Sequence, residues 1–163
     1  MTADELFRLH DPGWRHELVR GELRRKPFLN ARQGEVIPEL AISLADARAF
    51  GKFYAATGYL LARNPDTVRV AEIGFVRNDR VSRTAGYLEG APDVAFNILA
   101  SGDDVEEKTR EWLSAGASAV VIIDADTETV RIHRTGSTTS VNDVLEIDDV
   151  IPGWRLPLAE LFA

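Results

Sequence analysis

Glu72, Asn97 and Lys108 are polar residues set among apolar neighbours, and they are the chain's main candidates for chemistry. Glu72 is the only acid in the segment VRVAEIGFV. A carboxylate in that setting must be paired, protonated or metal-bound if it is buried. From periodicity alone, the favoured alternative is an acid on an edge strand that faces water.

Asp93 and Asn97 are the polar residues of another strand-like segment, GAPDVAFNILAS. Because side chains alternate along a strand, both point to the face opposite Val94 and Phe96. They lie about 13 Å apart at roughly 3.3 Å per residue, so they cannot both ligate one metal unless the strand bends strongly. Only one of them therefore belongs to any given site.

Lys108 lies in DDVEEKTREWLSAG, which has the acidic first turn and the terminal glycine, Gly116, that are typical of a helix. It sits at the margin of the apolar stripe that contains Trp112, so its ammonium can reach the sheet surface. Glu106 flanks that stripe equally well. Helical geometry therefore leaves a second interpretation open, in which Lys108 is a solvated partner of neighbouring glutamates.

The sequence lacks the other common catalytic motifs. It contains no phosphate-cradling glycine loop, no nucleophile elbow and no His-Glu-x-x-His motif. His10, His16 and His133 have no partner at ligand spacing, so we expect them at the surface or in turns. The chain has no cysteine, so any metal must be held by oxygen or imidazole ligands.

The first part of the chain predicts a short helix followed by a hairpin. Thr2 and Glu5 form a capping box before LFRL. The segment WRHELVRGELRRKPF alternates apolar and polar residues around Gly21, which predicts a β-hairpin with Gly21 at positive φ. We expect the basic side of this hairpin to be exposed.

That basic side is the best candidate for contact with nucleic-acid phosphates. Its residues are Arg20, Arg24, Arg25 and Lys26, with Arg15 nearby. The favoured alternative is an ordinary solvated hairpin that balances an acidic chain. A net charge of −7 argues against a protein that coats nucleic acid non-specifically.

The rest of the chain predicts an α/β fold. Residues 33–50 carry apolar positions at helical spacing, with Pro38 expected in the first turn. KFYAATGYLLA and TVRVAEIGFVR predict antiparallel strands joined at Asn64-Pro65-Asp66. NDRVSRTAGYLEG is expected to be a loop, and the continuous apolar run SAVVIID predicts a buried strand that pairs in parallel after a crossover helix.

Length and composition predict one domain over residues 1–163, since 45% of the residues are hydrophobic. No apolar run approaches the roughly 20 residues that span a bilayer, and the acidic N-terminus does not suit a signal peptide. We therefore expect a cytoplasmic protein with no membrane partner. Edge pairing of outer strands would give a homodimer.

Four segments together resemble the Uma-two family of restriction-endonuclease-like proteins, within the PD-(D/E)XK nuclease superfamily. They are VRVAEIGFVRNDR, YLEGAPDVAFNILAS, EEKTREWLSAGASAVVIIDADTETVRIHR and IPGWRLPLAELF. The resemblance implies a restriction-endonuclease-like mixed β-sheet flanked by helices, with the predicted hairpin at its N-terminus. It also implies metal-dependent cleavage of phosphodiester bonds in DNA, with Mg²⁺ or Mn²⁺ as the cofactor.

The resemblance assigns site residues by position. Glu72 stands where the family has a strand aspartate, and Asn97 stands where it has a glutamate. Lys108 matches the family's helix lysine, Glu35 matches an acid on the first long helix, and Asp93 is a secondary metal ligand. Asn97 offers one neutral oxygen in place of a carboxylate, which weakens the attraction for a divalent cation.

Two functions follow from this comparison. The first is a Mg²⁺-dependent DNA endonuclease with an altered active site. The second is a catalytically inactive homologue that acts as a nucleic-acid-binding or protein-interaction module. The second is motivated by Asn97, by the acidic net charge and by Leu99, which occupies the usual position of the superfamily's strand lysine.

Overall fold

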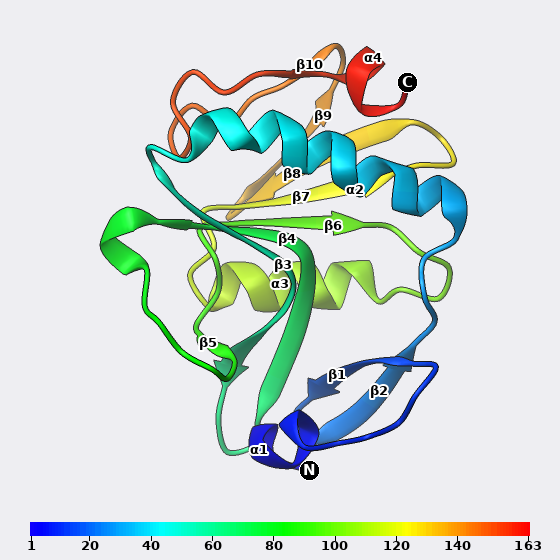
Figure 1. Ribbon diagram of the computed structural model, residues 1–163, viewed down its shortest axis with the longest axis vertical. Helices are drawn as coiled ribbons and strands as arrows, with labels where there is room; N and C mark the ends of the chain where they lie inside the picture. The colour runs from blue at the N-terminus through cyan, green and yellow to red at the C-terminus, as the bar shows by residue number, and fades with distance from the viewer.

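A large mixed sheet carries most of the apolar and alternating segments, and the computed structural model covers residues 1–163 (Figure 1). The strands run in the order β2-β1-β4-β6-β7-β8-β9, while β3 pairs with β4 and the short β5 pairs with β3. The sheet strands are β1 Arg15–Val19, β2 Glu22–Lys26, β3 Gly51–Ala62, β4 Thr67–Arg77, β5 Leu88–Glu89, β6 Val94–Ile98, β7 Ala119–Asp124, β8 Thr129–Arg134 and β9 Ser137–Val141. A separate two-stranded sheet joins β10 Val144–Leu145 to β11 Leu156–Pro157.

Helices cover both faces of the large sheet, as Figure 1 shows. The helices are α1 Ala3–Phe7, α2 Ala31–Leu44, α3 Val105–Ser114 and α4 Leu158–Leu161, with short 3₁₀ turns at Ala45–Ala47 and Asn78–Arg80. On one face α2 buries Val36 and Leu40 in the larger apolar cluster, together with Phe96 of β6. On the other face α3 buries Trp112 against Tyr59 of β3. None of the helices has the length and hydropathy that crossing a bilayer requires.

Two central strand pairings confirm their predictions: β3 and β4 are antiparallel, and β6 pairs in parallel with β7 after α3 crosses between them. The structure adds that β4 and β6 are antiparallel. The predicted hairpin is β1–β2, with Gly21 at φ +78°. The predicted capping box of Thr2 and Glu5 begins α1. The fold is therefore the α/β mixed sheet with flanking helices that the sequence indicated.

The long helix differs from its prediction at both ends. A capping box of Asn30 and Gln33 starts α2 at Ala31, and the helix ends at Leu44, because the chain must turn before β3. Pro38 consequently lies in the helix interior, and the prediction that it occupies the first turn was wrong. The Pro38 ring is exposed. In a helix such a ring crowds the carbonyl of the residue four positions earlier, which here is Gly34, and the absence of a side chain on Gly34 leaves more room there.

The segment predicted as a loop between β4 and β6 contains more structure than expected. Residues 78–80 form a 3₁₀ turn, and Leu88–Glu89 form β5, which pairs in parallel with β3 at Tyr59 and Leu60. The buried Leu88 joins the same apolar cluster as Tyr59, which is why this short stretch is held against the sheet. Two residues of strand are too short to show a recognisable alternation in the sequence.

Gly74 of β4 is a position where the fold requires the absence of a side chain. A Cβ there would overlap the hydroxyl of Tyr59, a buried group that has no hydrogen-bond partner in the protein. We expect Gly74→Ala to lower the free energy of unfolding by about 1–3 kcal/mol, as overpacking usually does. Urea denaturation should show a smaller cost when Tyr59→Phe has removed the hydroxyl, and an equal cost in both backgrounds would contradict this explanation.

Candidate functional site

A small pocket lies between the sheet, α3 and the β1–β2 hairpin. Its polar lining consists of Arg15, His16, Glu17, Lys26, Glu72, Asn97, Asp103, Lys108 and Thr109. The free space inside is about 30 Å³. A cavity needs about 10–15 Å³ to hold one water, so the pocket has room for about two waters.

Glu72 and Asn97 meet in this pocket from adjacent strands. The last paired residues of the β4–β6 ladder are Ile73 and Phe96, and Glu72 and Asn97 are the next residues of the two strands beyond that pair. Both line the pocket. The ladder stops at this point, because the Glu72 Oε2 atom accepts the Ile98 N–H at 2.8 Å. The strand pair therefore opens where the two candidate residues lie.

Glu72 is buried, with 7% of its surface exposed. Its strand β4 lies inside the sheet, paired with β3 on one side and with β1 and β6 on the other. The alternative of an edge-strand acid facing water was therefore wrong. The Glu72 Oε1 atom accepts a hydrogen bond from Arg15 at 3.0 Å, so the buried carboxylate is paired with a cation from the hairpin.

Asn97 is the unusual member of the site because its amide has no partner. It is buried, and neither Oδ1 nor Nδ2 makes a hydrogen bond within the protein. Thr109 Oγ1 and Trp112 Nε1, two buried groups on α3 that line the same pocket, also lack partners. Unsatisfied buried polar groups cost about 1–3 kcal/mol each, so their convergence on one pocket indicates a place for a polar ligand.

Lys108 reaches the pocket from α3, and its ammonium donates to the Glu17 Oε1 atom at 3.0 Å. Glu106, which helical geometry could not distinguish from Lys108, is exposed and does not line this pocket. The structure thus places Glu72, Asn97 and Lys108 together, each from a different element. Glu17 was not predicted as a site residue. It is the one acid in β1, and its place among the basic residues of the hairpin was the signal that could have indicated it.

A buried arginine holds the acids beside this pocket in place. Arg69 of β4 has no exposed surface, and it donates to Glu111 at 2.6 Å and to Asp104 at 3.0 Å. Burial alone would raise the pKa of Asp104, but the hydrogen bonds and charges of Arg69 and Lys26 hold this pKa well below its ordinary value. Asp104, which immediately precedes α3, is therefore ionised at neutral pH and pairs with Arg24, Lys26 and Arg69.

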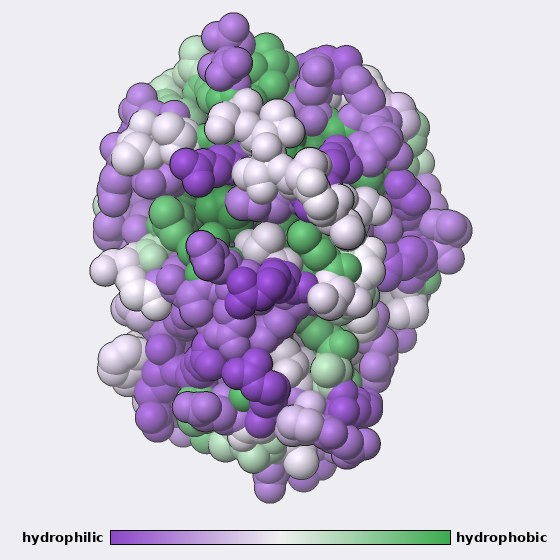
Figure 2. Space-filling view, turned by 180° about the vertical axis from the view of Figure 1, so that it is seen from behind, coloured by the Kyte–Doolittle hydropathy of each residue, from purple (hydrophilic) through white to green (hydrophobic).

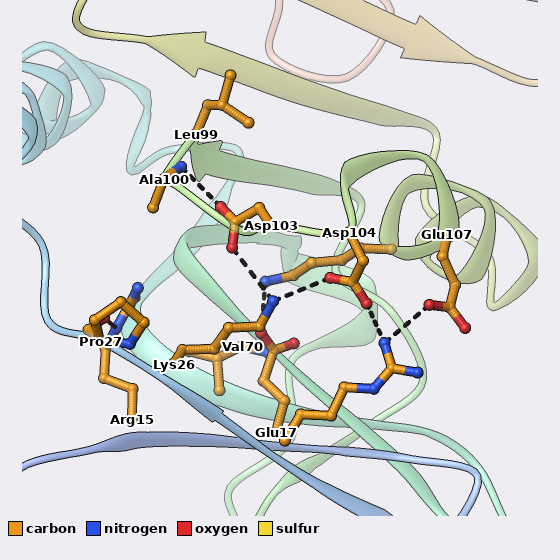
Figure 3. Close-up of polar contacts among 12 residues, drawn as sticks. Arg15, Glu17, Lys26, Pro27, Val70, Leu99, Ala100, Asp103, Asp104 and Glu107 are labelled. Atoms are coloured by element: carbon orange, nitrogen blue, oxygen red, sulfur yellow. Dashed lines mark hydrogen bonds and ion pairs between the residues drawn. The ribbon is translucent and has the colours of Figure 1, made fainter.

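The basic hairpin faces this acidic segment. Lys26 points between Asp103 and Asp104, with Nζ–O distances of 3.3 and 3.1 Å, as Figure 3 shows. Arg24 pairs with Asp104 and Glu107. The expectation that the basic side is exposed was wrong for these two residues, because the hairpin packs on α3.

The other two predicted phosphate-binding residues lie further out. Arg20 pairs with Glu107, and Arg25 pairs with Asp11, but their side chains stay 61% and 53% exposed. Seen from behind, hydrophilic side chains gather over the middle and lower part of the molecule (Figure 2). Arg20 and Arg25 therefore remain accessible to a partner.

Asp93 and Glu35 are not part of the pocket. Asp93 lies at the opposite end of the face it shares with Asn97, where it accepts from the Arg77 N–H at 2.8 Å and from Arg80 at 2.7 Å. Glu35 is exposed and pairs with Arg32 on the same helix. The structure therefore separates both residues from Glu72, which agrees with the spacing argument that only one of Asp93 and Asn97 belongs to a site.

His16 differs from its expectation, because it is half-buried and lines the pocket while it contacts Asp11 at 2.9 Å. No group of three or more His, Cys, Asp or Glu side chains is arranged to hold a metal ion. A divalent ion in this pocket would therefore need the amide oxygen of Asn97, waters or substrate oxygens as further ligands.

The mixed sheet, its flanking helices and the pocket at the opening of β4 and β6 define a nuclease-like fold. A family model described as "Putative restriction endonuclease", Uma2, matches residues 3–159, and the chain belongs to this family. A crystal structure of "a putative nuclease belonging to DUF820" from Anabaena variabilis is similar, with a TM-score of 0.84 and 19% sequence identity. The match covers 99% of this chain and 97% of that one. No curated protein matches the chain.

Proposed function

We propose that this protein is a divalent-metal-dependent DNA endonuclease with an altered active site. The observation that carries the proposal is the meeting of Glu72, Asn97 and Lys108 in one pocket, at the point where β4 and β6 separate. Membership of a family described as restriction endonucleases agrees with this chemistry. The substrate is then the phosphodiester backbone of DNA.

The pocket's oxygen atoms fit a magnesium or manganese ion that is shared with substrate. Mg²⁺ usually binds one or two carboxylates and completes its shell with waters and substrate phosphates. Glu72 would supply the carboxylate, and the unpartnered Oδ1 of Asn97, which lines the same pocket, would supply a neutral oxygen. When bound, such an ion would acidify a water and offset the charge that develops on the phosphate.

The chain's own residues orient the reacting groups around that position. The Ile98 N–H fixes Glu72, and Glu17 fixes the Lys108 ammonium at 3.0 Å. An ammonium has three donors, so Lys108 keeps two of them for a phosphate oxygen or a water. Lys108 is therefore assigned to binding and orientation, with Glu17 as its positioning residue.

Arg20 and Arg25 are proposed to contact the DNA backbone, because they are the most exposed cations among the four predicted for that role. Arg24 and Lys26 are held against α3 and instead fix the hairpin. Neutralising Arg20 and Arg25 should make DNA affinity less dependent on salt, since fewer counterions are released on binding.

Cleavage of plasmid and single-stranded DNA in Mg²⁺ or Mn²⁺ tests the proposed activity. We expect cleavage by the wild-type protein and loss of product, to the background level, in Glu72→Gln and Lys108→Ala. Glu89→Gln is a matched control, because Glu89 is an exposed acid whose only ion pair is with Arg63. Cleavage that is unchanged in the Glu72 and Lys108 variants would contradict this assignment of the site.

The ion pairs favour a second candidate function, a catalytically inactive homologue that acts as an interaction module. Each carboxylate lining the pocket has a protein cation: Arg15 pairs with Glu72, Lys108 with Glu17, and Lys26 with Asp103. Calorimetry with Mn²⁺ distinguishes the two candidates. A stoichiometric site with a Kd below the millimolar range supports the endonuclease, and no binding supports the interaction module.

A further inference from the structure

Arg15 is the residue that neutralises Glu72, and its position is fixed at two points. Its Nη1 atom donates to the Glu72 Oε1 atom at 3.0 Å, and its Nε atom donates to the Pro27 carbonyl at 3.0 Å. The Arg15 side chain is 27% exposed, compared with 8% for Glu72, so the guanidinium lies on the outer side of the carboxylate. The hairpin thus supplies a cation at the carboxylate oxygen that the Ile98 N–H leaves free.

The other two cations of the pocket do not neutralise Glu72. Lys108 binds Glu17, and Lys26 binds Asp103 and Asp104. The Asn97 amide makes no hydrogen bond to Arg15 or to any other residue. Glu72 is therefore the only side chain that Arg15 pairs with, and the Asn97 Oδ1 atom stays without a hydrogen-bond partner.

A guanidinium and a divalent ion compete for the same carboxylate oxygen. Mg²⁺ binds carboxylates at 2.0–2.1 Å, and like charges a few ångströms apart repel strongly in a partly buried site. We propose that Arg15 is a built-in competitor of the metal, which occupies Glu72 in the metal-free protein and must leave it before a divalent ion binds. This inference rests on the proposed function, and it adds a residue that sets metal affinity.

Calorimetric titration with Mn²⁺, in the absence of DNA, tests the competition directly. We expect Arg15→Gln to bind Mn²⁺ about tenfold more tightly than the wild-type protein, because the competing charge has gone. Arg25→Gln is the matched control: it removes the same charge from the same hairpin, but Arg25 pairs with Asp11 outside the pocket. Its affinity for Mn²⁺ should stay close to that of the wild type.

A measurement on the wild-type protein covers the case in which Arg15→Gln fails to fold. In an NMR titration with Mg²⁺, the Ile98 amide reports on Glu72, because it donates to that carboxylate. We expect the Arg15 Nε and Ile98 amide resonances to shift with the same midpoint, as the guanidinium leaves when the ion binds. An Ile98 shift without an Arg15 shift would overturn the proposal.

The outcomes separate this inference from the proposed function. Tighter Mn²⁺ binding by Arg15→Gln without DNA cleavage supports the competition and contradicts the endonuclease. Equal Mn²⁺ affinity of the wild type, Arg15→Gln and Arg25→Gln overturns the competition, whether or not DNA is cleaved. The absence of any Mn²⁺ binding by Arg15→Gln also overturns it.

Discussion

Replacing Arg69 with methionine is expected to lower the free energy of unfolding by about 3–5 kcal/mol, the usual cost of breaking a buried ion pair by removing one partner. Arg69 is fully buried among Glu17, Asp104 and Glu111. Methionine keeps much of the apolar stem, so the loss reports the uncompensated carboxylates and not a large cavity. Urea denaturation followed by circular dichroism measures the change.

Arg63→Met is the matched control for this substitution. Arg63 lies just beyond the end of β3, and its one ion-pair partner is the exposed Glu89. Exposed ion pairs contribute about 0–1 kcal/mol, so this variant should unfold nearly like the wild type. Similar stability changes in the two variants would show that the burial of Arg69 is not what makes its ion pairs important.

The effect of Arg69→Met should decrease in acid. The pKa of Asp104 is held below its ordinary value of 3.8 in the folded protein, by Arg69 and Lys26 against the opposing effect of burial. A carboxyl with a lowered folded-state pKa contributes stability above its ordinary pKa, and this contribution is lost as the pH falls toward the folded-state value. The stability difference from the wild type should therefore be constant near neutral pH and decrease below about pH 4.

The arrangement of the central strands could be predicted because local patterns determine it. The apolar runs of β6 and β7 flank a helix of ordinary length, and a parallel pair joined by a crossover helix is the usual result. Alternation along β6 also predicted that Asn97 lies on the face opposite Phe96, and in the structure Asn97 lines the pocket beside α3. These are consequences of side-chain periodicity, which a single sequence displays.

The face of each residue in β4 could not be predicted in the same way. Strict alternation puts Arg69 and Glu72 on opposite faces, yet both lie on the α3 side, where Arg69 binds Glu111 and Glu72 lines the pocket. The register of β3 sets Ala56 opposite Glu72, and Ala56 has φ +49°, which marks a local distortion of the strand pair. An alanine gives no sequence signal for positive φ, so periodicity could not reveal this change of face.

The ion-pair partners of the charged residues also could not be predicted from the sequence. The hairpin contains five cations within twelve residues, and their pattern indicates a basic surface. Because the hairpin packs against the acidic start of α3, Lys26 lies between Asp103 and Asp104. Such long-range ion pairs depend on where β1 and β2 dock, which no local pattern specifies.

Asn97→Glu is expected to raise the affinity for Mn²⁺ by about 100-fold, which corresponds to about 2.7 kcal/mol. The substitution adds a second carboxylate to the pocket that Glu72 lines, at the open end of the β4–β6 pair. Two carboxylates attract a divalent ion far more strongly than a carboxylate and an amide, because the amide oxygen carries no net charge. Calorimetry on the wild type and the variant measures the difference.

The same substitution should make stability depend on the metal. Without an ion, the additional buried carboxylate lies close to Glu72 and destabilises the fold. Bound Mn²⁺ removes that repulsion, so it should raise the midpoint of thermal unfolding more in Asn97→Glu than in the wild type. The two measurements together separate a metal effect from a general change in stability.

Asn97→Gln is the control that isolates charge from side-chain length. It has the length of glutamate but stays neutral, so its Mn²⁺ affinity should remain within a few-fold of the wild type, a difference of about 1 kcal/mol or less. If Asn97→Glu binds Mn²⁺ no more tightly than Asn97→Gln, the ion does not bind between Glu72 and residue 97. The pocket would then be no metal site, and its unpartnered amide would have to serve a different polar ligand.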